Sequence, residues 1–141
     1  MFTVFHSWYS LRYGTIPVPK LVDFGKETGF ETLVFTDINN STGALEFLKE
    51  CREKNILAVV GIEFMNDENW LYTGIARNEH GFSELNNWLT EINLRGEKFS
   101  ESLPDFENVF FVLPFSQRRK VLSKNQWIGV NAFEANKLLM L

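Results

Sequence analysis

The chain has 141 residues and a formal net charge of −4, with 45% hydrophobic and 15% aromatic residues. These fractions exclude a disordered chain, and the charge provides no global attraction to nucleic acid or to an anionic membrane. The single cysteine, Cys51, excludes an intramolecular disulfide and a zinc site built from several cysteines. The sequence has neither a signal peptide nor an apolar run long enough to span a membrane. We therefore expect a single domain that is soluble and cytoplasmic and has no membrane partner.

An apolar run at residues 1–5 is followed by His6 and by a loop rich in hydroxyl and aromatic residues that ends at Gly14. β-Branched and aromatic residues favour a strand, whereas serine and glycine favour a turn. His6 is therefore expected at the carboxyl end of a first strand. In parallel α/β folds, ligands bind at this edge of the sheet.

Two acidic residues follow later apolar segments in the same way. Asp37 comes shortly after an expected strand at residues 33–35, and Glu63 comes shortly after one at residues 56–60. The carboxyl ends of parallel strands meet at one edge of the sheet, so these acids are expected to lie near His6. His6, Asp37 and Glu63 together outline a candidate site.

Hydrophobic periodicity and end signals predict the remaining elements. In chain order, we expect a helix at residues 20–28 that closes at Gly29, a helix from Ala44 that ends at Asn55, a strand at 70–76, a helix at 82–93, a strand at 109–113, a short strand at 127–130 and a helix from Ala132 that Asn131 caps. The alternation of strands and helices predicts a largely parallel sheet or barrel with right-handed crossovers. The last helix runs into an apolar end without a C-cap, so we expect residues 1–141 to be one domain at the N-terminus of a longer chain.

The run from Phe5 to Gly14 resembles the opening of PHP (polymerase and histidinol phosphatase) domains, in the version found at the N-terminus of bacterial DNA polymerase III alpha subunits. Residues 35–47, 60–63 and 75–85 resemble three further segments of that family, in the right order. Each motif alone is weak, but four in order are fairly specific. The resemblance implies an α/β fold, namely a partial, distorted PHP-type (βα) barrel with mainly parallel strands.

In active members of the family that this chain resembles, His, Asp and Glu side chains at strand ends bind a small cluster of metal ions. The metal ions are used to hydrolyse phosphoesters. By this resemblance, His6 and Glu63 occupy metal-ligand positions. Other ligand positions of the family fall on residues that cannot serve, namely Val4, Tyr13, Ile38 and the segment near Trp70-Leu71. Two ligands are too few to hold a metal cluster. We therefore treat His6, Asp37 and Glu63 as remnants of a degenerate site and assign no catalytic residue.

Several residues also have a plainer interpretation. His6 is either a hydrogen-bonded structural residue or a remaining ligand, and Glu63 is a candidate ion-pair partner for it. Asp37 suits an Asx-turn or a cap as well as a site. Cys51, on the apolar face of a helix, is expected to be inert. The basic run 118–120 is either a phosphate contact or a solvated surface.

The ligand count favours a structural or partner-binding domain whose hydrolytic activity has been lost. By resemblance, its partners would be the remainder of the polymerase chain, the proofreading exonuclease subunit, and DNA through the full-length polymerase. The polymerase would be the nucleotidyltransferase, while this domain would need no cofactor. The alternative is a stand-alone, divergent PHP phosphoesterase that uses zinc or manganese at His6 and Glu63. A third reading is a small α/β protein whose motif matches are accidental, and the four ordered motifs argue against it.

Overall fold

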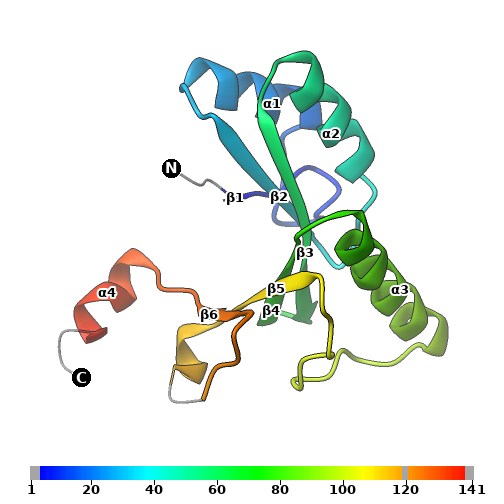
Figure 1. Ribbon diagram of the computed structural model, residues 1–141, viewed down its shortest axis with the longest axis vertical. Helices are drawn as coiled ribbons and strands as arrows, with labels where there is room; N and C mark the ends of the chain where they lie inside the picture. Colours follow the sequence, from blue (N-terminus) through cyan, green and yellow to red (C-terminus); the bar gives the residue numbers. More distant parts are fainter. Residues whose placement is uncertain (1–3, 119–120, 139–141) are drawn as a thin grey trace.

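Figure 1 shows the computed structural model, which describes residues 4–118 and 121–138. Three α-helices pack against a continuous sheet, and a last helix follows the final strand and lies away from the sheet. In chain order, the elements are β1 (Val4–Phe5), α1 (Val18–Glu27), β2 (Thr32–Ile38), α2 (Ala44–Glu53), β3 (Leu57–Asn66), β4 (Asn69–Ala76), α3 (Glu79–Arg95), β5 (Val109–Leu113), the 3₁₀ turn η1 (Phe115–Gln117), β6 (Gln126–Ile128) and α4 (Ala132–Leu138).

The six strands form one sheet in the order β1-β2-β3-β4-β5-β6. β1, β2 and β3 are parallel to one another, and β6 is parallel to β5. β4 is antiparallel to both of its neighbours: a tight turn joins it to β3, and the segment that contains α3 joins it to β5. The expectation of an α/β fold with mainly parallel strands is confirmed, and over the described residues the sheet is not closed into a barrel.

The structure corrects the expected bounds of two strands that carry site residues. β2 continues through Asp37 to Ile38, and β3 continues through Glu63 to Asn66. Gly61 looks like a strand end in the sequence but lies inside β3, where a Cβ atom would be 2.2 Å from the carbonyl oxygen of Gly74. A glycine inside a strand often marks such a close backbone approach. Of the first expected strand, residues 1–3 lie outside the described part.

Two hydrophobic clusters join the helices to one face of the sheet. α1 and α2 cover β2 and β3, where the rings of Phe35 and Phe47 stack with their centroids 4.8 Å apart. α3 covers β3, β4 and β5 and inserts Leu85, Leu89 and Ile92 among their side chains. Because both clusters contain side chains of β3, they form a core that extends along this face of the sheet. No helix in the described ranges is long and apolar enough to cross a membrane.

Helix ends follow the local signals of the sequence closely. Gly29 and Asn55 adopt left-handed conformations, with φ of 79° and 55°, directly after α1 and α2. Asn131 and Glu134 cap α4 reciprocally, because each side chain accepts a hydrogen bond from the backbone N–H of the other. α3 begins three residues earlier than expected, because Asn78 accepts a hydrogen bond from the N–H of Gly81. The end of the last helix, at residues 139–141, lies outside the described part.

Candidate functional site

The loop after β1 is held against the sheet by Asp37. One carboxylate oxygen of Asp37 accepts hydrogen bonds from the Ser7 backbone N–H at 2.6 Å and the Ser10 hydroxyl at 2.7 Å, and the other accepts from the Ser7 hydroxyl at 2.7 Å. The Ser10 oxygen in turn accepts from the Ile38 N–H at 2.9 Å. Asp37, Ser7 and Ser10 are almost completely buried. Asp37 therefore forms neither the Asx-turn nor the helix cap that its sequence context suggested, since its hydrogen-bond donors lie 27–30 residues earlier in the chain.

His6 and Glu63 meet on the sheet, as the sequence suggested. His6 Nε2 lies 3.2 Å from Glu63 Oε2, and their side chains are 28% and 17% exposed. The hydrogen bond to Glu63 raises the pKa of His6 above its ordinary value of 6.5; burial opposes this rise, and the negative charges of Glu63 and Asp37 add to it. The partly buried pair therefore favours a charged imidazole.

These residues do not fit the metal cluster that the family resemblance implies. The two candidate metal ligands, His6 and Glu63, form a hydrogen bond with each other. Both carboxylate oxygens of Asp37 accept hydrogen bonds from serine groups. In residues 4–118 and 121–138, no group of three or more His, Cys, Asp and Glu side chains could hold a metal ion. Metal-assisted hydrolysis needs several convergent ligands.

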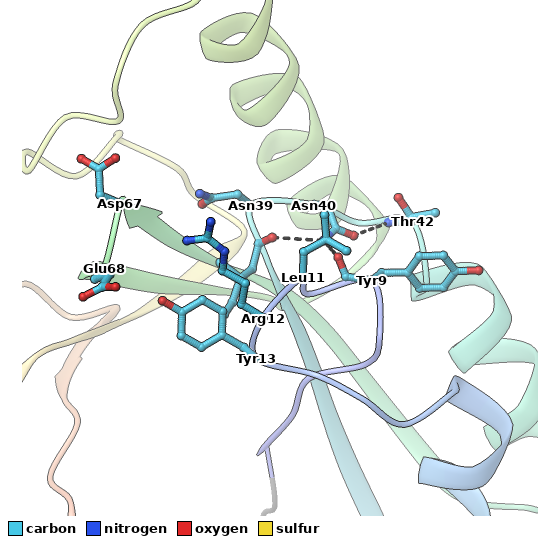
Figure 2. A pocket seen from close by; sticks show the side chains of 10 residues that line it. Tyr9, Leu11, Arg12, Tyr13, Asn39, Asn40, Thr42, Asp67 and Glu68 are labelled. Carbon is cyan, nitrogen blue, oxygen red and sulfur yellow. Dashed lines mark hydrogen bonds between the residues drawn. The ribbon is translucent and has the colours of Figure 1, made fainter.

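Beside this pair lies a cavity that the sequence did not indicate. It measures about 790 Å³ and is bounded by the loop after β1, the loop after β2 and the β3–β4 turn. Its walls comprise Tyr9, Leu11, Arg12, Tyr13, Ile38, Asn39, Asn40, Thr42, Asp67 and Glu68. Figure 2 shows the side chains of Arg12 and Tyr13 directed toward the turn that carries Asp67 and Glu68, whereas the ring of Tyr9 points away.

The backbone of this cavity is unusual. Arg12, Asn39 and Asp67 all adopt positive φ, at 76°, 50° and 54°. Asparagine and aspartate tolerate this conformation, so the residue types at Asn39 and Asp67 are compatible with a turn. The residue type at Arg12 does not indicate one. Non-glycine residues in this region often lie at binding sites, because the surrounding structure must hold them there.

The remaining candidates have simpler environments. Cys51 is completely buried on α2, and burial raises the pKa of its thiol to about 11. In the basic run 118–120, only Arg118 is described; its guanidinium lies 4.5 Å from the centre of the Phe115 ring. Cys51 thus packs in the core as expected, and Arg118 contacts the neighbouring 3₁₀ turn.

Comparison with known proteins connects this geometry to a family. A family model described as "PHP domain" matches residues 4–123. The DNA polymerase III subunit alpha of Ureaplasma parvum serovar 3 is 28% identical over 107 residues, covering 76% of this chain and 11% of that protein. The subunit from Halalkalibacterium halodurans is 30% identical over 120 residues, covering 79% and 11%. The chain thus spans only about a tenth of the length of these relatives.

A solved structure has the same fold. The crystal structure of a "putative metal-dependent phosphoesterase" from Bifidobacterium adolescentis superposes with a TM-score of 0.58, covering 99% of this chain and 82% of that one. The two sequences are 11% identical, so this likeness concerns the fold alone. The family model, in contrast, matches most of the sequence. The chain belongs to the PHP domain family.

Proposed function

We propose that residues 1–141 form the PHP domain of a DNA polymerase III alpha subunit, and that the domain has a structural or partner-binding role and no longer hydrolyses phosphoesters. The observation that carries the proposal is the pairing of His6 with Glu63. The two side chains in the family's ligand positions contact each other, and Val4, Tyr13 and Ile38 occupy further ligand positions without a suitable donor. A cluster of metal ions would find too few ligands here.

Similarity to the alpha subunits supports the polymerase part of the proposal. The matched relatives are named DNA polymerase III subunit alpha, and the chain covers 11% of each. Such a domain would be the N-terminal part of a longer polymerase, and nucleotidyl transfer would belong to the remainder. Its partners would be that remainder and the proofreading exonuclease subunit, with DNA reached through the full-length polymerase.

The alternative is a stand-alone, metal-dependent PHP phosphoesterase. One observation favours it: the chain covers 82% of the structurally similar phosphoesterase but only 11% of the polymerases. In that case His6 and Glu63 would have to separate and bind zinc or manganese together with ligands from elsewhere.

Metal content and hydrolysis distinguish these functions. The protein is purified with manganese and zinc present, analysed for bound metal, and assayed with bis(p-nitrophenyl) phosphate, a generic phosphodiester. We expect neither stoichiometric metal nor turnover. Stoichiometric metal, with turnover that disappears in His6→Ala and Glu63→Ala but persists in His80→Ala, would establish the enzymatic alternative, because His80 lies on α3 and is exposed.

The partner role needs a separate measurement. The tagged chain is isolated from the cells that encode it, and the co-purifying proteins are identified. We expect a polymerase III alpha polypeptide or the proofreading exonuclease, either as a separate protein or as a continuation of the same chain. Recovery of the chain without any replication protein would contradict the proposed partner role while leaving the question of hydrolysis to the first experiment.

A further inference from the structure

Neither His6 nor Glu63 lines the cavity around Arg12 and Tyr13, although Tyr13 and Ile38, at two of the ligand positions that the family resemblance assigns, do. Its volume of about 790 Å³ lies within the range of small-molecule sites. The properties of this cavity do not depend on the polymerase assignment.

Hydrogen bonds of two asparagine side chains connect the loops that line the cavity. The side chain of Asn39 donates to the Met65 carbonyl at 2.8 Å and accepts from the Met65 N–H at 2.9 Å, and thus ties the loop after β2 to β3. The side chain of Asn40 donates to the Tyr9 carbonyl at 3.0 Å and accepts from the Thr42 N–H at 3.1 Å, which ties the same loop to the loop after β1. Both asparagines are therefore engaged in the walls, and their hydrogen bonds hold the loops after β1 and β2 in place.

Opposite charges face this cavity without neutralising each other. Among the described residues, the guanidinium of Arg12 forms no ion pair, and neither does the carboxylate of Glu68. Asp67 is paired with Lys98 at 2.7 Å. Figure 2 shows the guanidinium of Arg12 and the ring of Tyr13 pointing toward the turn that carries Glu68. A cation and an anion thus line the same space and are separated by it.

This separation restricts the ligands that fit. A simple anion at Arg12 would share the cavity with the carboxylate of Glu68, and a simple cation at Glu68 would share it with the guanidinium of Arg12. Like charges brought together at a binding site cost affinity. A ligand that carries both charges a short distance apart satisfies both sides, because arginine binds carboxylates through two parallel N–H groups and a carboxylate accepts hydrogen bonds from an ammonium.

We infer that this cavity binds a zwitterion of the amino-acid class, with its carboxylate at Arg12 and its ammonium at Glu68. The side chain of the ligand packs against the ring of Tyr13 and the exposed side chain of Leu11. These two residues favour an apolar or aromatic amino acid, since aromatic surfaces bury large area with few rotatable bonds.

Calorimetric titration of the full chain with L-phenylalanine at neutral pH tests the inference. Two blocked relatives separate the charges: N-acetyl-L-phenylalanine lacks the ammonium, and L-phenylalaninamide lacks the carboxylate. We expect saturable binding of the amino acid and a loss of about tenfold or more for each blocked form. The dipeptide of phenylalanine, whose two charges lie farther apart, distinguishes a free amino acid from the ends of a short peptide.

Two variants link binding to the residues named. Arg12→Gln and Glu68→Gln should each weaken binding of L-phenylalanine by about tenfold or more, because each leaves one end of the zwitterion without its partner. Arg95→Gln and Glu101→Gln are matched controls, since both residues are exposed and lie outside this cavity. Circular dichroism checks that all four variants fold.

Three results would overturn the inference. The first is equal affinity for the amino acid and its blocked forms, and the second is unchanged binding in both Arg12→Gln and Glu68→Gln. The third is the absence of saturable binding when the folded wild-type chain is titrated with each of the standard amino acids to millimolar concentration.

Discussion

His6 Nε2 and Glu63 Oε2 lie 3.2 Å apart and connect the residue after β1 to a residue inside β3, across the intervening strand β2. The contact links the end of β1 to β3 through a single partly buried pair. Two of the positions to which the family resemblance assigns metal ligands thus hydrogen-bond to each other. This relationship allows the stability of the fold to be linked to the protonation of one histidine.

The free energy of unfolding should depend on pH through His6. Glu63 raises the pKa of His6 above 6.5, so the stabilisation is fully present below pH 6.5 and is lost as the pH rises through the raised value. Glu63→Gln should therefore lower the free energy of unfolding by about 1 kcal/mol on the acidic side, the modest value expected of a partly exposed pair. On the alkaline side the two proteins should converge.

Urea unfolding at a series of pH values measures this difference. His80→Gln serves as the control, because His80 is exposed and the variant should follow the wild type at every pH. A difference between Glu63→Gln and the wild type that stays constant with pH would show that the His6 charge does not contribute.

Asp37 should be much more important for stability. Asp37→Asn keeps one oxygen for the Ser7 N–H and the Ser10 hydroxyl, loses the negative charge that strengthens both bonds, and places an NH₂ group opposite the buried Ser7 hydroxyl. We expect a loss of about 3 kcal/mol in the free energy of unfolding, because a buried donor is left without an acceptor.

Asp105→Asn is the matched control for this substitution, and it should change stability by less than about 0.5 kcal/mol because Asp105 is exposed. Chemical denaturation of both variants gives the comparison. Equal stability of Asp37→Asn and Asp105→Asn would mean that the serine loop is not anchored through Asp37.

Cys51 should resist thiol reagents in the folded protein. Its side chain is completely buried, and burial raises its thiol pKa to about 11, so little thiolate is present at pH 8. Reaction with a colorimetric disulfide reagent should be slow in buffer and fast in urea. Rapid labelling without denaturant would show that α2 opens locally.

Restoring the ligand positions of the family should restore metal binding. The triple variant Val4→His, Tyr13→Glu, Ile38→His introduces three metal-ligand side chains at positions that the family resemblance assigns, which together with His6 and Glu63 is enough for a closed ligand set. We expect at least one zinc or manganese ion per chain by elemental analysis, and a lower content when Glu63→Ala is added to the triple variant. A folded triple variant without metal would mean that the open sheet cannot bring these positions together.

Much of the fold could be predicted from the sequence. The hydrophobic period and the end signals at Gly29, Asn55 and Asn131 act within a few residues, and the structure shows each of them as expected. The motif order from Phe5 to Glu63 likewise identified the PHP family, because the residues that carry it are contiguous in short segments.

The tertiary structure decided how these residues are used. β3 continues past Gly61 because Gly74, thirteen residues later, approaches its backbone, and no local signal carries that information. Asp37 accepts hydrogen bonds from Ser7 and Ser10, a choice that depends on how β1 and β2 are paired.

Of the features described, the cavity at Arg12 depends most on the tertiary structure. It forms only because three loops meet at one end of the sheet, and the positive φ of Arg12 has no counterpart in residue type. The sequence therefore determined the elements and the family, since propensity and motif are short-range properties. The contacts of each side chain depended on strand register and loop placement, which are long-range properties of the folded chain.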